Sequence, residues 1–391
     1  MNAPPDLPRH DHDVPAWVSR LLRQALEAGA SDLHVEPQAD GTLLRLRRHG
    51  VMGDWQRIPA AWAPRLAARI KVMAQLDLAE RRLPQDGRLH DVAHGIGNIR
   101  VATLPTVHGE KLCLRLGEPG DAPDLDRLGL STSARQALGH ALQQPQGLIL
   151  ITGPTGAGKT TTLYACLAAL DRHSRHIATV EDPVERLLPG INQTAVQPRI
   201  GLDFASVLRA LLRQDPDVLM VGEIRDRETA SMAVQAAETG HLVLTTLHAG
   251  STVEALTRLR HLGIPDYQLA DTVKLVMAQR LLRRLCARCR QPQAHMVLQA
   301  VAETSAHGPC MAQGCPACRD GHDGRVGIYE LLPMDAALAA AWCAGLDSTG
   351  LQARMREQGW PLLADEATRL WRRGEVSSDD ILRVLGNRPA C

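Results

Sequence analysis

Eight consecutive residues of this 391-residue chain have the types and the spacing of a phosphate-binding loop. The pattern Gly-x-x-x-x-Gly-Lys-Thr follows the apolar run Leu148–Thr152 and precedes a helical pattern over Thr161–Leu170. Glycines let the backbone turn its N–H groups toward a phosphate, and the new helix directs its positive end to the same anion. The lysine of such a loop reaches the β- and γ-phosphates, and the next hydroxyl is a ligand for Mg²⁺. We therefore expect ATP and Mg²⁺ to bind through Gly153, Pro154, Thr155, Gly156, Ala157, Gly158, Lys159 and Thr160.

Acidic and histidine side chains follow three further apolar runs downstream of the loop. These side chains are Glu181, Glu223 and His248. Because the carboxyl ends of parallel strands meet at one edge of a sheet, they could converge with Lys159 on one crevice. There the Glu223 carboxylate would hold Mg²⁺ or orient the attacking water. The residues alone leave a purely structural role for His248 open.

Short apolar strands must alternate with helices to position these residues. The expected strands are Leu148–Thr152, Ile177–Val180, Val218–Val221 and His241–Thr246. Each is followed by polar residues and a helical pattern, which is typical of a mainly parallel sheet with helices on both faces. The sequence therefore predicts an α/β P-loop domain over residues 129–285, preceded by a Pro- and Gly-rich linker at 118–128.

The first 117 residues have a different pattern. Helical spacing begins at Trp17 and recurs over Ala61–Leu76, while Leu33–Glu36 and Leu43–Arg47 are typical of short strands. A hairpin is expected over 98–116. We therefore expect a small α+β domain over 17–117, behind a disordered arm at 1–16 that is rich in Pro, Asp and His.

Four cysteines form two C-x-x-C pairs near the C-terminal third of the chain. Two such pairs suit tetrahedral Zn²⁺, with Fe–S ligation as the open alternative. A site with four thiolates has no coordination position left for a substrate, so the metal would be structural. We expect a zinc-binding element over 286–332 and a helical domain over 333–391; the ligands would be Cys286, Cys289, Cys315 and Cys318.

The composition excludes several classes of protein. Hydrophobic residues make up 45% and charged residues 22% of the chain, which is ordinary for a globular protein and excludes a disordered one. A net charge of +1 and an aromatic content of 3% disfavour a nucleic-acid motor, so no specific nucleic acid is expected as a partner. No apolar run is long enough for a membrane span and the N-terminus has no signal-peptide pattern, so we expect a cytoplasmic protein.

Taken together, the motifs resemble those of the type II secretion and type IV pilus assembly ATPases, also called secretion traffic ATPases. The four boxes of that family are similar to residues 153–162, 179–185, 212–226 and 239–248. Residues 30–37, 81–88 and 99–116 resemble its second N-terminal domain, and 324–332 with the cysteine pairs resemble its metal-binding segment. The resemblance implies a RecA-like P-loop fold, a PAS-like α+β N-terminal domain, an inserted tetracysteine zinc element and a C-terminal helical region.

The resemblance also implies a role for each site residue. Glu223 would hold Mg²⁺ or act as general base, with Glu181 as the alternative base, and His248 would contact the γ-phosphate. Arg100 and Arg115 stand where the family supplies arginines to the phosphates, although a solvated strand face is the plainer interpretation of them.

At the level of the machine, the resemblance implies a hexameric motor that acts on an inner-membrane platform protein and assembles pilins or pseudopilins. The tetracysteine segment favours secretion or pilus extension over retraction, because retraction motors of the family typically lack it. The sequence does not separate secretion, pilus extension and DNA uptake. A nucleic-acid motor and an ATP-binding ring protein without turnover are the alternative classes.

Two departures from the family pattern stand out. Only about 16 residues precede the helix at Trp17, so we expect a short form without the family's first N-terminal domain. Many relatives have Thr-Asn where this chain has Ala249-Gly250, directly after His248.

Overall fold

A computed structural model of the chain contains two compact units, residues 1–121 and 122–391. It describes residues 5–8, 10–91, 96–116, 124–293, 308–318 and 320–386. Most of the predicted linker, at 118–123, lies outside the described residues, and Leu125–Leu128 forms a 3₁₀ turn. Within the described ranges, no helix combines the length and the apolar character that a bilayer span requires.

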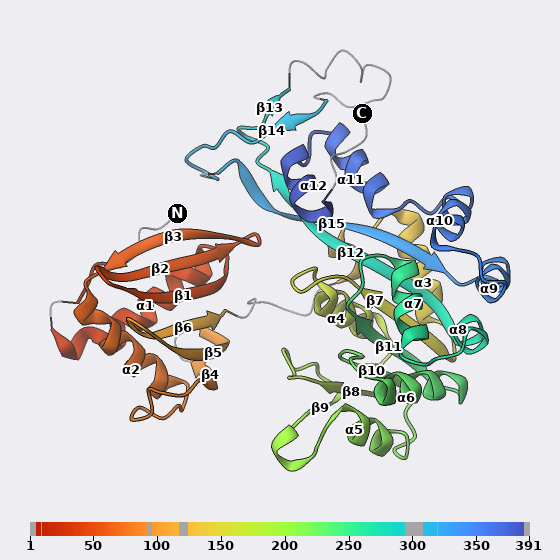
Figure 1. Cartoon of the computed structure of the whole chain (residues 1–391), viewed down its shortest axis with the longest axis horizontal. Coiled ribbons are helices and arrows are strands. Elements are labelled where there is room, and N and C mark those ends of the chain that lie inside the picture. Colours follow the sequence, from red (N-terminus) through yellow and green to blue (C-terminus); the bar gives the residue numbers. More distant parts are fainter. Residues whose placement is uncertain are drawn as a thin grey trace. The chain divides into compact units, whose positions relative to one another are not determined.

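The N-terminal unit is one six-stranded antiparallel sheet with two helices (Figure 1). The strand order is β3-β2-β1-β6-β5-β4. Its elements are α1 (Val14–Glu27), β1 (Ala30–Gln38), β2 (Gly41–Arg48), β3 (Val51–Ile58), α2 (Ala63–Met73), β4 (Gln85–Asp91), β5 (Ile96–Thr106) and β6 (Gly109–Arg115).

Alternation along the strands creates the core of this unit. Leu33 and Val35 of β1 point to the helices and are fully buried, whereas the intervening residues point to the opposite face. The first helix begins earlier than predicted, since α1 starts at Val14, within the arm expected at 1–16. The buried Trp17 also donates a hydrogen bond to the carbonyl oxygen of Pro5. Strand β4 was not predicted, because its polar sequence lacks apolar alternation.

The C-terminal unit is built on a seven-stranded sheet of order β15-β12-β7-β11-β10-β8-β9 (Figure 1). The strands from β12 to β9 run parallel, and β15 pairs antiparallel with β12. The strands are β7 (Gly147–Thr152), β8 (Ile177–Glu181), β9 (Asn192–Ala195), β10 (Val218–Val221), β11 (Leu242–Leu247), β12 (Val273–Leu285) and β15 (His322–Pro333). A separate small hairpin pairs β13 (Gln291–Pro292) with β14 (Cys310–Met311).

Helices cover both faces of this sheet, as the alternation of strands and helices predicts. Leu148 and Leu150 of β7 pack with α5, α6, α7 and α8, whereas Ile149 and Ile151 pack with α3 and α4. These helices are α3 (Thr132–Leu142), α4 (Lys159–Ala169), α5 (Phe204–Leu211), α6 (Arg227–Glu238), α7 (Thr252–His261) and α8 (Asp266–Thr272). The C-terminal unit is therefore a P-loop, RecA-like α/β domain, and the N-terminal unit has an α+β fold.

The end of the chain belongs to the same unit and is not a separate helical body. Residues 322–332, which sequence patterns assigned to the zinc element, form β15 of the main sheet. Helices α9 and α10 share the core of the sheet, and α11 and α12 pack on β12 and β15. They are α9 (Ala336–Cys343), α10 (Ser348–Glu357), α11 (Leu363–Arg372) and α12 (Ser378–Leu385). Short apolar runs interrupted by arginines concealed the sheet membership of β12 and β15.

Candidate nucleotide site and cysteine cluster

The phosphate-binding pattern forms the turn between β7 and α4. Gly153, Gly156 and Gly158 all have positive φ, and Gly158 is the N-cap of α4. A Cβ at Gly153 would lie 2.7 Å from the carbonyl oxygen of Gln279, so only glycine fits between the loop and β12. Thr160 is exposed in the first turn of α4, where its hydroxyl is accessible to a cation. Backbone, lysine and hydroxyl together fit a nucleotide phosphate and Mg²⁺.

Lys159 lies against its own loop. Its ammonium donates to the carbonyl oxygens of Gly153 at 2.8 Å and Pro154 at 3.1 Å, and the residue is 9% exposed. Burial lowers the pKa of Lys159 to about 8, partly offset by the negative charge of Glu223. These two carbonyl bonds are interactions that a phosphate can replace, so the lysine is held ready for an anion.

Charged side chains from three strand ends form one chain of contacts at this edge of the sheet. Glu223, after β10, forms an ion pair with Arg225, whose guanidinium lies 3.5 Å from the carboxylate of Asp182, after β8. His248, after β11, places its Nε2 3.6 Å from the other carboxylate oxygen of Glu223. The structure therefore brings Glu223 and His248 together beside Lys159, which affects the pKa of His248.

His248 is the accessible member of this chain, with 51% of its side chain exposed. Partial burial and the positive charge of Lys159 lower the pKa of His248, against the opposing effect of Glu223. This shift favours the neutral ring, which offers one hydrogen-bond donor and one acceptor.

Glu181 has a different environment from Glu223. It is 4% exposed, and one of its oxygens accepts a hydrogen bond from the Tyr164 hydroxyl at 2.5 Å. Its other oxygen accepts from the Thr179 hydroxyl at 2.6 Å and the Gln193 amide at 3.0 Å. Burial and the bond to Glu181 raise the pKa of Tyr164. These three partners occupy three of the roughly four lone-pair sites of the carboxylate, so the geometry favours a positioning role for Glu181.

Arg100 and Arg115 lie in the N-terminal unit, on the face of its sheet opposite the helices. They are direct cross-strand neighbours on β5 and β6, and Arg88 of β4 lies opposite Arg100 on the other side. Arg115 is also 3.4 Å from the carboxylate of the buried Asp32. Like charges directly opposite one another destabilise a sheet, and the Asp32 carboxylate offsets part of the positive charge of this row.

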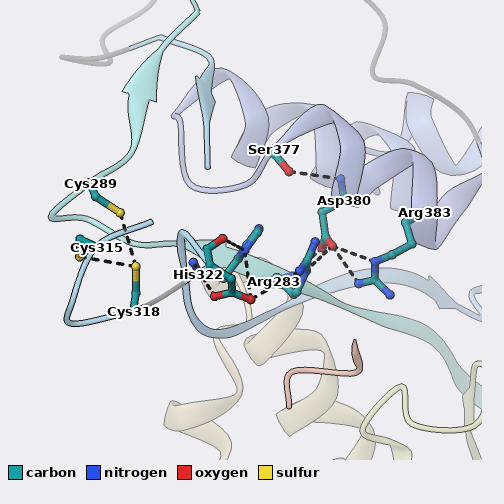
Figure 2. Close-up of polar contacts among 9 residues, drawn as sticks. Arg283, Cys289, Cys315, Cys318, His322, Ser377, Asp380 and Arg383 are labelled. Atoms are coloured by element: carbon teal, nitrogen blue, oxygen red, sulfur yellow. Dashed lines mark hydrogen bonds and ion pairs between the residues drawn. The ribbon is translucent and has the colours of Figure 1, made fainter. Parts of the chain in front are cut away.

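The four predicted cysteines come together in the folded chain. Cys286 and Cys289 directly follow β12, and Cys315 and Cys318 lie shortly before β15. Their sulfur atoms all lie within 4.8 Å of one another. Cys318 Sγ lies 3.4 Å from Cys289 Sγ and 3.6 Å from Cys315 Sγ (Figure 2). Tetrahedral Zn–S bonds of ~2.3 Å require sulfur separations of ~3.8 Å, so the cluster fits zinc. Backbone N–H groups of Cys318 and Ala317 lower the pKa of Cys315 to about 7, which favours the thiolate that a metal requires.

Several residues of the site were not predicted from the sequence. Arg225 follows Glu223 by two positions, and this spacing was its only signal. Arg280 and Gln279 interrupt the apolar run of β12, and a polar pair inside a buried strand is a usable signal for a functional contact. Tyr164 and Gln193 carry no such signal, since they reach Glu181 only in the folded chain.

The fold and these residues together define a P-loop ATPase. Comparison with known proteins identifies the family within this class. It belongs to the type II/IV secretion system protein family, whose model matches residues 9–383. It is 43% identical to a protein of Escherichia coli K12 named protein transport protein HofB homolog, over 94% of this chain and 81% of that protein.

A second relative and a solved structure support the same assignment. The type IV pilus assembly ATPase PilB of Pseudomonas aeruginosa is 42% identical, over 96% of this chain and 68% of its own length. The crystal structure of the pilus retraction motor PilT with bound ADP superposes with a TM-score of 0.65 at 26% identity, covering 94% of this chain and 96% of that one. The chain is thus an ATPase of a family that serves secretion and pilus machinery.

Proposed function

We propose that this chain is the cytoplasmic ATP-hydrolysing motor that drives assembly of pilins or pseudopilins, for type IV pilus extension or type II secretion. The observation that carries the proposal is the single edge of the sheet where the phosphate loop, Glu223 and His248 meet. The cysteine cluster favours assembly over retraction, in line with the identities of 42% to the assembly ATPase and 26% to the retraction motor.

The proposed reaction is direct attack of water on the γ-phosphate. Mg²⁺, held by the Thr160 hydroxyl and through water by Glu223, would neutralise charge on the phosphates. Lys159 would exchange its two loop carbonyls for phosphate oxygens. Glu223 would accept the proton of the attacking water, and release of its ion pair with Arg225 would free that carboxylate.

We further propose that Arg100 and Arg115 complete the site from an N-terminal unit, within a hexamer. Arginines supplied in this way stabilise the charge that develops on the transferring phosphoryl group. Closure on ATP and release after hydrolysis would convert the reaction into domain rotation against an inner-membrane platform protein.

The two candidate bases can be separated by matched substitutions. Glu223→Gln should keep nucleotide affinity and lower kcat by ~10²–10⁴-fold, because it removes the proton acceptor and preserves the shape. Glu181→Gln should lower stability by about 1–3 kcal/mol, since the amide keeps one acceptor oxygen where the carboxylate offers two to Tyr164, Thr179 and Gln193, with a smaller loss in kcat. Phosphate release and melting temperature measure both. Normal hydrolysis by Glu223→Gln would move the base to Glu181.

The motor function is tested in the source organism. The gene would be deleted and complemented with wild type or with Lys159→Ala, which should lower turnover by ~10³-fold or more because the phosphates lose their cation. Surface pili and secreted proteins would be scored in parallel. Loss of pili alone indicates extension, and loss of secreted proteins alone indicates secretion. Restoration of either phenotype by Lys159→Ala would contradict a motor role.

A further inference from the structure

Strand β12 passes directly beneath the phosphate loop after it leaves its pairing with β7. Ala278 is the last residue in register with Thr152 of β7. The next side chain, Gln279, is 1% exposed; its amide donates to the carbonyl oxygen of Ala157 at 2.7 Å and accepts from the Thr162 hydroxyl at 2.8 Å. Gln279 therefore holds the loop and the first turns of α4 to β12.

Arg280, the following residue, reaches in the other direction. It is 9% exposed, and its guanidinium donates to the carbonyl oxygen of Gln279 at 2.9 Å and to that of Gly250 at 2.6 Å. Burial lowers the pKa of Arg280, and the carboxylates of Glu330 and Glu254 oppose that shift. A planar fork with several donors can bridge two carbonyls in this way, whereas an ammonium on a flexible stem cannot hold the same geometry.

The segment that Arg280 reaches is also anchored at Ala249 and Thr252. Thr152 exchanges hydrogen bonds with the backbone of Ala249 at 2.9 and 3.3 Å. Thr252 donates to the buried carboxylate of Glu330 on β15 through its N–H at 2.9 Å and its hydroxyl at 2.7 Å. The backbone after His248 is thus held from β7, β12 and β15, while the His248 side chain stays half exposed.

Gly250, whose carbonyl oxygen accepts from Arg280, also contacts Glu254. Its N–H donates to the Glu254 carboxylate at 2.7 Å, and a Cβ at this position would lie 2.5 Å from that same oxygen. A side chain at 250 would therefore require the Glu254 carboxylate to move. Gly250 is one of the two residues, Ala249-Gly250, at which this chain differs from the Thr-Asn pair of many relatives. The difference therefore falls at the residue that accepts from Arg280.

We propose that Arg280 is a positioning residue for ATP hydrolysis, whose guanidinium ties the histidine segment to β12 beneath the phosphate loop and keeps His248 in place beside Glu223. The inference rests on the proposed role of this site in hydrolysis. A buried guanidinium is expensive in a strand that apolar residues could fill, and its two carbonyl bonds are the interactions that offset this burial.

The test compares Arg280→Met and Arg280→Lys with Arg284→Met, a control on the same strand whose side chain is exposed. ATPase kinetics and the affinity for a fluorescent ADP analogue would be measured on the full chain. Arg280→Met should lower kcat by ~10–100-fold, because small misplacements of catalytic groups have effects of that size. The analogue should bind within about threefold of wild type, since Gln279 still holds the loop. Arg280→Lys should recover part of the loss, and Arg284→Met should equal wild type.

A double mutant with His248→Ala separates positioning from general instability. If Arg280 acts through His248, adding His248→Ala to Arg280→Met should change kcat by less than about twofold. Three results would overturn the inference. The first is a double mutant whose loss in kcat is the product of the two single losses. The others are an unchanged kcat in Arg280→Met, or losses of affinity and kcat of equal size in that variant. If Arg280→Met melts early, Arg280→Lys gives the same readout with the charge retained. If the wild-type protein does not hydrolyse ATP, the proposed function itself is wrong. If the wild type is active and Arg280→Met is equally active, only this inference is wrong.

Discussion

Two neighbouring stretches of β12 contact sites of opposite character. At the phosphate loop, above Gln279, Lys159 is bonded to loop carbonyls, Thr160 is exposed and His248 is half exposed. Nearer the C-terminal end of the strand, Asp380 of α12 is fully buried and accepts from the backbone and side chain of Arg283 at 2.6 and 2.8 Å (Figure 2).

Arg383 completes that second cluster at 2.9 Å, and Cys289, Cys315 and Cys318 lie beyond it, past His322 (Figure 2). The buried carboxylate of Asp380 finds its partners within the unit. The contrast teaches that one strand can connect a site whose contacts must exchange during turnover with a site whose contacts must not. Substitutions at the first should affect rate, and substitutions at the second should affect stability.

The largest effect should follow loss of the metal site. Purified protein should hold about one tightly bound zinc per chain, and Cys286→Ser should lower the melting temperature by on the order of 10 °C, because metal-binding energy is folding energy. Metal analysis and thermal melting measure this. Cys343→Ser, at an exposed cysteine on α9, is the matched control. Less than half an equivalent of zinc, or an unchanged melting temperature in Cys286→Ser, would contradict the structural role.

Asp380→Asn should have the next largest effect. It leaves two arginines facing a neutral group in a buried position, which should lower stability by about 3 kcal/mol, at the low end of the usual range because Arg383 is 40% exposed. Melting of the variant beside Asp379→Asn, an exposed neighbour, measures it. An equal melting temperature for the two variants would show that the buried cluster adds nothing. The affinity for ATP should stay at the wild-type value in both.

The smallest effect concerns the pH dependence of nucleotide binding. Lys159 has a pKa of about 8 and must be charged to attract phosphate. As the pH rises from 7 to 9, the charged fraction falls, so the Kd for ATP should increase by about tenfold. Lys159→Arg, which keeps its charge over this range, should show a flat profile. Titration of a fluorescent nucleotide measures both, and a flat wild-type profile would contradict the buried environment of the lysine.

The sequence predicted the nucleotide site better than its surroundings. Local motifs carry the phosphate loop, because its chemistry needs a fixed spacing of glycine, lysine and threonine over eight residues. The parallel strands before Glu181, Glu223 and His248 were also predicted within one residue, since fully buried strands are continuous apolar runs. Strands β4, β12 and β15 were missed or misassigned, because polar residues and arginines break that signal.

What the sequence by itself determined is the set of chemical groups: a phosphate loop, two acidic residues, a histidine and four thiols in spaced pairs. Only the tertiary structure distinguished the two carboxylates, since Glu181 is enclosed by Tyr164, Thr179 and Gln193 while Glu223 faces Arg225 and His248. Only the tertiary structure, too, showed that Arg280 links β12 to the histidine segment. The physical reason is that a motif fixes spacing along the chain, whereas hydrogen-bond partners distant in sequence are set by how strands pair and helices pack.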